Sequence, residues 1–179
     1  MKKIKSFFFL LALACTMTSC FNNTGSQTTP QMHFGYLYVN PQFEGDTIVG
    51  AKDTLYDHFN DELGLWYLDT LQLGDTVMFP ALFTSNVNNL VSINAVFDTT
   101  MVDLWFAVDM EDEAIKKALQ ATSDPKKGLL LFNPMYNFVT FPIYIVPQKA
   151  GAHPIKITVT SDSQYPTNSS LFTLPVKND

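Results

Sequence analysis

From Met32 onward, apolar and polar residues alternate with a period of two, and this pattern constrains the fold more than any other feature of the sequence. Turn-forming residues separate the alternating segments at intervals of roughly eight to twelve residues, which is the spacing of an antiparallel sandwich or barrel. Shorter apolar pieces predict further strands near 47–49, 65–73 and 129–132. The main predicted strands, rich in β-branched and aromatic residues, are 36–39, 77–84, 90–97, 101–108, 139–146, 155–160 and 171–176.

The alternation also predicts which side chains enter the core. One face of the late strands carries only apolar residues, namely Val139, Phe141, Ile143 and Ile145 in one strand and Ile155, Ile157 and Val159 in the next. Proline has no backbone N–H to donate to a neighbouring strand. We therefore expect edge strands or bulges at Pro80, Pro142 and Pro175.

One segment breaks the β pattern and predicts a helix over about 110–121. Asp109 is the expected N-cap, and the acidic residues after it suit the first turn of a helix. Two i,i+4 ion pairs are expected within it, Asp112–Lys116 and Glu113–Lys117. A narrow apolar stripe is formed by Ile115, Ala118 and Leu119.

Three short motifs accompany these strands: Leu-Gly-Asp-Thr-Val at 73–77, Val-Pro-Gln-Lys-Ala-Gly at 146–151 before the strand at 155–160, and Leu-Pro-Val at 174–176. Through them, residues 71–179 resemble the immunoglobulin-like β-sandwich domains of cell-envelope lipoproteins. The resemblance implies a single immunoglobulin-like antiparallel β-sandwich over residues 34–179 with one inserted helix. It implies no binding specificity, and the Cys…Trp…Cys frame of true immunoglobulin domains is missing.

The N-terminus has the pattern of a secretory signal, with a positive stretch at Lys2, Lys3 and Lys5 before an apolar run at 7–15. Nine apolar residues span only about 14 Å as a helix, too short for a stable membrane anchor. The Met-Thr-Ser-Cys that follows at 17–20 resembles the lipobox of bacterial lipoproteins.

The lipobox resemblance implies a signal peptide over residues 1–19, a lipid on Cys20 and a flexible tether within 20–33. It further implies a protein anchored to the cell envelope through its lipid, and we expect the outer membrane, with either face possible. Two alternatives stay open: lipidation at Cys15, and cleavage by an ordinary signal peptidase.

Charge and cysteine content exclude several classes of partner and of fold. All 11 basic residues are lysines, so the chain has no guanidinium to grip phosphate, and we expect no nucleic-acid partner. Cleavage before Cys20 would leave eight lysines against 17 acidic residues, a formal balance of −9. No cysteine follows Cys20, so no disulfide can stabilise the domain.

None of the common nucleophile, nucleotide-binding or zinc-protease motifs occurs in the chain. We therefore expect a non-catalytic binding or structural module with no cofactor, which presents loops or an edge strand to a protein or a glycan. A hydrolase or metal-dependent enzyme using Asp57, His58 and Asp61 is the less favoured alternative.

The densest group of potential metal ligands comprises Asp53, Asp57, His58, Asp61 and Glu62. Calcium accepts such oxygen ligands, but this spacing matches no calcium-binding loop, and the glycine of an EF-hand is missing. A solvated acidic loop is favoured over a metal site.

Trp105 is the main candidate for ligand binding. The alternation of its strand places Asp103, Trp105, Ala107 and Asp109 on the face opposite the core. An exposed indole beside carboxylates suits a sugar, whose apolar face stacks while its hydroxyls are held, and Trp66 and Tyr67 offer a second aromatic surface. The competing interpretation is that the helix or a loop covers Trp105.

Five Asp-Thr pairs recur along the chain, and five of its 13 aspartates precede threonine. Asp ends turns and Thr opens strands, so repeated hairpins explain the pattern. The Asp-Thr-aliphatic triplet also resembles the O-glycosylation acceptor of envelope proteins in some Gram-negative phyla. That resemblance implies glycans on Thr54 and Thr99 first, and then on Thr47, Thr70 and Thr76.

Overall fold

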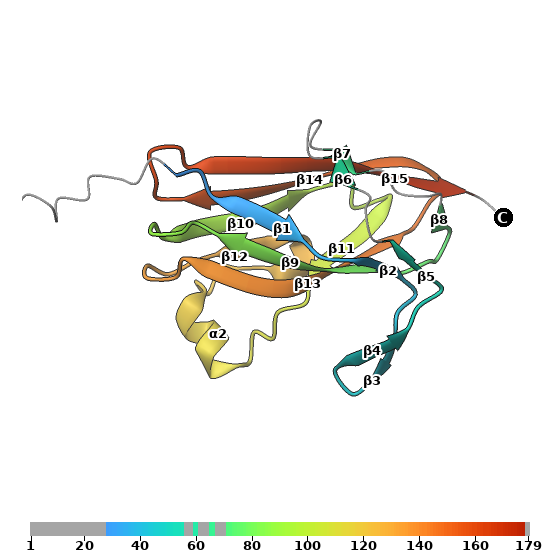
Figure 1. Ribbon diagram of the computed structural model, residues 1–179, viewed down its shortest axis with the longest axis horizontal. Helices are drawn as coiled ribbons and strands as arrows, with labels where there is room; N and C mark the ends of the chain where they lie inside the picture. Colours follow the sequence, from blue (N-terminus) through green and yellow to red (C-terminus); the bar gives the residue numbers. More distant parts are fainter. Residues whose placement is uncertain (1–27, 56–58, 61–64, 67–70, 178–179) are drawn as a thin grey trace, which may run out of the picture.

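The computed structural model describes residues 28–55, 59–60, 65–66 and 71–177, and most of its strands form two sheets that face each other (Figure 1). The first sheet has the order β11-β13-β9-β2-β5, with β1 also paired to β9. Its strands are β11 (Val102–Phe106), β13 (Phe138–Pro147), β9 (Val77–Thr84), β2 (Leu37–Val39), β5 (Asp53–Leu55) and β1 (Gln31–Phe34).

The second sheet has the order β12-β10-β14-β15-β7-β6, with β8 also paired to β15. Its strands are β12 (Leu129–Leu131), β10 (Leu90–Val96), β14 (Gly151–Ser161), β15 (Thr167–Lys177), β7 (Leu65–Trp66), β6 (Phe59–Asn60) and β8 (Leu71–Gln72). A separate hairpin pairs β3 (Gln42–Glu44) with β4 (Thr47–Gly50), and the helical segments are α2 (Glu113–Ala118) and the 3₁₀ turn η1 (Pro125–Lys127).

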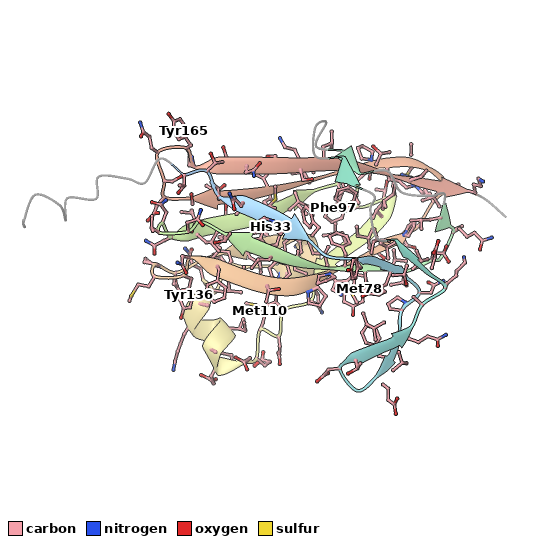
Figure 2. All side chains as sticks on the ribbon, in the orientation of Figure 1. His33, Met78, Phe97, Met110, Tyr136 and Tyr165 are labelled. Carbon is pink, nitrogen blue, oxygen red and sulfur yellow. The ribbon has the colours of Figure 1, made fainter. Side chains whose placement is uncertain are left out.

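The core lies between the inner faces of the two large sheets, where apolar side chains meet (Figure 2). The residues predicted for it are buried in β13 and β14, except that Val139 is only partly buried. Phe79 of β9 reaches across the core, because its ring lies 6.2 Å from that of Phe172 of β15 in an edge-to-face contact. These features confirm the predicted mostly β fold, a sandwich of two sheets with a short helix.

Of the two alternatives predicted for the proline-containing strands, an edge position or a bulge, the edge position is wrong for β9 and β13, because both are interior strands. Pro80 and Pro142 face each other across these two strands, and their carbonyl oxygens accept from Gly35 and Ala107 on the outer sides. In an antiparallel pair the nitrogen and the carbonyl of one residue point to the same side. The ring nitrogen of each proline, which has no hydrogen to donate, therefore points away from the other proline. Pro80 lies between the residues of β9 that pair with β1 and those that pair with β2, and Pro142 lies just before the residues of β13 that pair with β11. Pro175 likewise lies between the residues of β15 that pair with β7 and those that pair with β8.

The helix is shorter than predicted and begins three residues later. The carboxylate of Asp112, not that of Asp109, caps α2 by accepting from the N–H groups of Ala114 and Ile115 at 2.7 and 3.1 Å. Asp109 instead accepts from the N–H of Glu111 in the preceding turn. At the other end, Leu119 leaves the helical conformation and bridges to Phe132, which ends the helix early.

The predicted ion pairs of the helix also differ, since Lys116 pairs with Glu111 and Glu113 at 3.2 and 3.3 Å. At the N-terminal side, β1 begins at Gln31, so the last residues of the range assigned to the tether belong to a sheet. Within the described residues, no helix has the length and hydropathy of a membrane-spanning segment.

Candidate functional site

A hollow of about 570 Å³ runs along β11 between this strand and the turn η1. It is lined by Phe97 and Thr99 from the loop after β10, by Val102, Asp103, Leu104 and Trp105 of β11, and by Lys126 and Lys127 of η1. The lining thus combines aromatic and aliphatic groups with a few charged ones, which is the usual composition of a small-ligand site.

The alternation within β11 decides which side chains reach the hollow from each face of the sheet. Val102 and Leu104 are buried on the core side, whereas Asp103 is exposed and Trp105 is partly buried on the other side, as the sequence predicts. Among the residues that the structure describes, β11 is the last strand of its sheet and pairs only with β13. Because side chains from both faces of β11 line the hollow, the hollow lies along the edge of this strand that does not pair with β13.

Trp105 stacks on Tyr144, the residue opposite it on β13. The ring centroids are 5.1 Å apart and the planes differ by only 3°, which describes an offset parallel stack. Burial raises the pKa of Tyr144. The stack fixes the indole at the surface and leaves it part of the wall of the hollow.

Polar groups stand on both sides of the indole. The Oδ2 atom of Asp103 accepts a hydrogen bond of 2.8 Å from Nε2 of Gln148, which orients the carboxylate. On the opposite wall both lysines of η1 are exposed, and Lys127 lies 3.2 Å from Oδ2 of Asp124 in an exposed ion pair. The hollow therefore offers hydrogen-bonding groups of both charges around an aromatic surface.

Gly128 seats η1 against β11. Its φ of 66° lies in the left-handed region, and a Cβ there would come within 2.8 Å of the Ala95 Cβ and 3.1 Å of Cδ2 of Leu104. The carbonyl oxygen of Gly128 also accepts from the N–H of Ala95 at 2.8 Å. Only glycine allows so close an approach, so this residue lets the end of η1 pack directly against β10 and β11.

Several predicted site residues lie outside the part of the chain that the structure describes. They are Cys20, Asp57, His58, Asp61, Glu62, Tyr67, Thr70 and the side chain of Trp66. Asp53 of the acidic group lies in β5, where its Oδ1 accepts from the N–H of Thr54. Within the described ranges, no three His, Cys, Asp or Glu side chains gather as metal ligands.

The other Asp-Thr pairs lie in different surroundings. Thr47 in β4 and Thr99 after β10 are exposed, whereas Thr54 and Thr76 are partly buried. Hydrogen bonds from the hydroxyl and the N–H of Thr100 lower the pKa of Asp98, in a tight turn of the kind that the pattern predicts.

The sequence pointed to Asp103 and Trp105 but missed the residues around them. The alternation of β13 places Tyr144 outward, yet only the register between β11 and β13 shows that it faces Trp105. Phe97 lies one residue past β10, at the end of the segment predicted as a strand, and Lys126 and Lys127 come from a turn that carries no periodic signal. Their approach to β11 depends on tertiary packing.

No protein-family model matches the chain, and no curated protein matches it. Solved structures to which it is similar include a PapD-like domain of human CEP192, with a TM-score of 0.36 and 13% identity over 65% of this chain and 82% of the other. A family 123 glycoside hydrolase from Clostridium perfringens has a TM-score of 0.33 and 15% identity, and the alignment covers 83% of this chain and 28% of the hydrolase. AggA, the major subunit of aggregative adherence fimbriae type I from Escherichia coli, has a TM-score of 0.35 and 9% identity over 86% of this chain and 99% of the subunit.

Proposed function

We propose that this chain is a non-catalytic binding module that is anchored to the cell envelope by a lipid on Cys20 and binds a glycan in the hollow along β11. The observation that carries the glycan proposal is the Trp105–Tyr144 stack in the wall of that hollow. The protein is then a receptor or adaptor for carbohydrate and carries out no reaction on it.

The hollow suits the two chemical faces of a sugar. A pyranose ring has an apolar face that packs on an indole, while its hydroxyls donate and accept hydrogen bonds at the rim. Asp103 supplies an acceptor, and the exposed ammonium groups of Lys126 and Lys127 supply donors. The volume of the hollow, about 570 Å³, falls in the range of small-ligand sites.

Isothermal titration of the purified mature chain with a panel of oligosaccharides tests the glycan proposal. We expect binding by the unmodified protein, loss of about tenfold or more in affinity in Trp105→Ala, and a smaller loss in Trp105→Phe, since one aromatic stack contributes about 1–3 kcal/mol. The matched control is Tyr165→Ala, which removes an exposed aromatic ring from a loop outside the hollow. Equal affinity of Trp105→Ala and the unmodified chain would contradict the proposal, as would reproducible turnover of a substrate.

The lipid anchor is tested separately by mass spectrometry of the N-terminal peptide from the membrane fraction. We expect the mature protein to begin at Cys20 and to carry acyl chains there, and Cys20→Ser to release it from the membrane. A mature N-terminus at another residue, or an unmodified thiol, would exclude this anchor.

A protein partner is the second candidate, favoured by the free edge of β11. The backbone groups of Met101 and Ala107 bond toward β13, so by the alternation of an antiparallel ladder those of Leu104 point away from β13. An extended peptide that pairs with this edge would use backbone hydrogen bonds. Its affinity would change little in Trp105→Ala, which distinguishes it from a stacked sugar.

A further inference from the structure

Three loops meet at one end of the sandwich, and the N-terminal strand enters at the same end. The loops are 85–89 between β9 and β10, 132–137 between β12 and β13, and 162–166 between β14 and β15. Gln31 of β1 and Phe138 of β13 both lie opposite Thr84, the last residue of β9. Figure 1 shows the start of β1 beside these three loops, at the end opposite to the C-terminus.

Four large apolar side chains project into solvent at this end. Their exposed fractions are 70% for Val87, 89% for Met135, 64% for Phe138 and 53% for Tyr165, and we call this group the apolar tip. Asp162 is the only charged residue in the three loops and the strand residues that flank them, and no lysine is present there.

Polar contacts hold the loops of the apolar tip in place. The N–H and Nδ2 of Asn89 each donate to Asp162 at 2.7 Å, so the single carboxylate is already bonded within the protein. Oδ1 of Asn89 accepts from the N–H of Met135 at 2.9 Å, and the N–H of Ser85 donates to the carbonyl of Asn137 at 2.8 Å. Tyr136 and Tyr165, from two different loops, are labelled at this end in Figure 2. The exposed apolar groups therefore sit on preorganised loops.

The chain reaches the apolar tip from the direction of its proposed anchor. Nδ2 of Asn88 donates to Oγ1 of Thr28 at 3.4 Å, and Nδ2 of Asn168 donates to the carbonyl of Pro30 at 3.0 Å, which fix the first described residues at this end. Cys20 precedes Thr28 by eight residues. Fully extended, such a segment spans at most about 28 Å, so a lipid on Cys20 keeps the apolar tip close to the bilayer.

We propose that the apolar tip rests in the interfacial layer of the membrane that holds the lipid on Cys20. This inference rests on the proposed lipid anchor. Tyrosine and other aromatic side chains favour the headgroup level of a bilayer, and apolar groups enter its boundary. The three loops carry no lysine of their own, although Nδ2 of Asn133 in the loop 132–137 donates to the carbonyl of Lys117 in the neighbouring helix α2. We therefore expect these loops to insert by apolar contact and not by attraction to anionic headgroups.

The same orientation presents the hollow away from the membrane. Tyr144, which stacks on Trp105, lies six residues along β13 from Phe138. At about 3.3 Å per residue this places the stack roughly 20 Å from the apolar tip along the strand. A domain whose apolar tip rests in the membrane thus holds its candidate ligand site away from the lipid headgroups.

The test places a fluorophore at the apolar tip of the lipidated mature chain in neutral phosphatidylcholine vesicles. Met135→Cys receives an environment-sensitive label, because in the mature chain the only other cysteine is Cys20, whose thiol carries the lipid. Leu73→Cys is the matched control, since Leu73 is 46% exposed in the turn before β9, at the opposite end of the sandwich. We expect a blue-shifted emission and quenching by spin-labelled lipid at position 135, and neither at position 73.

Three outcomes would overturn the inference. If the protein floats with the vesicles but the label at position 135 reports water, the anchor stands and the apolar tip does not insert. If the blue shift persists without vesicles and grows with protein concentration, a second copy of the chain covers the tip. If the protein does not float with the vesicles at all, the proposed anchor fails and this inference fails with it. A second label at Tyr165→Cys guards against a local effect of the substitution at Met135.

Discussion

At the residue scale, Asp75 is the one Asp, Glu or Lys residue that is buried within the described part of the chain. The residue is 6% exposed, and its carboxylate lies 2.9 Å from the ammonium group of Lys52, while Nδ2 of Asn40 and the N–H of Gln72 also donate to it. Burial by itself would raise the pKa of Asp75, but the hydrogen bonds from Gln72, Lys52 and Asn40 outweigh it and lower this pKa below 3.8. Asp75 thereby joins the start of β9 to the segments beside β2 and β5.

Asp75→Asn is expected to lower the free energy of unfolding by about 1–3 kcal/mol at pH 7, because it removes the negative charge that pairs with the half-exposed Lys52 and replaces one acceptor oxygen of a buried side chain by a donor. Since the folded pKa lies below the unfolded one, this stabilisation is complete above the ordinary aspartate value of 3.8 and is lost as the pH falls through the folded pKa. Urea titrations between pH 7 and pH 2 measure it. We expect the difference between the two proteins to shrink below about pH 4. Asp46→Asn, in the exposed turn of the β3–β4 hairpin, is the control, and a difference that stays constant with pH would contradict this role for Asp75.

Two buried serines allow a direct comparison of bonded and unbonded hydroxyls. Ser170 is 4% exposed, and its Oγ has no hydrogen-bond partner within the part of the chain that the structure describes. Ser85 is fully buried, and its hydroxyl donates to the carbonyl of Asn88. We expect Ser170→Ala to raise the free energy of unfolding by about 1 kcal/mol, and Ser85→Ala to lower it by about 1–3 kcal/mol. Thermal and urea unfolding measure both, and destabilisation by Ser170→Ala would show that its hydroxyl has a partner.

At the scale of elements, the structure departs from the sequence-based prediction at the N-cap of α2, which is Asp112 and not Asp109. Asp112→Ala removes the acceptor of two N–H groups, so we expect a loss of about 1 kcal/mol in the local stability of a helix only six residues long. Amide hydrogen exchange of α2 measures this loss as roughly fivefold faster exchange. Asp109→Ala should change these rates less, because Asp109 accepts only from the N–H of Glu111. A larger effect of Asp109→Ala than of Asp112→Ala would contradict this cap and support the longer helix that the sequence predicts.

The strands were predictable because their alternation is local, whereas the neighbours of each strand are not. The pattern of β14 identifies its buried residues directly, but nothing in the sequence shows that the two-residue strands β7 and β8 pair with β15 in parallel. The residues of the candidate site are likewise predictable only where the signal is local. Trp105 follows from alternation within β11, while the opposing Tyr144 and the approach of η1 depend on register and packing between distant segments.

At the scale of the whole molecule, one hydrophobic core supports both sheets without any disulfide. The cysteines of the sequence are at 15 and 20, before the first strand, so burial must supply the stability. Phe79 is fully buried at the centre of this core, with its ring 5.6 Å from that of Phe34 in β1 and 6.2 Å from that of Phe172 in the opposite sheet. A residue that touches both sheets couples their stability.

Phe79→Ala is therefore expected to lower the free energy of unfolding by about 3–5 kcal/mol, and to lower it equally for the two sheets. Hydrogen exchange measured separately in β13 and β14 tests this, because a single cooperative unit loses the same stability at both strands. The control is Leu82→Ala, on the same strand but 37% exposed, for which we expect a change of about 0.5 kcal/mol. A loss confined to β13 would mean that the sheets unfold independently. The β14–β15 half of the domain would then survive the opening of the half that carries Trp105.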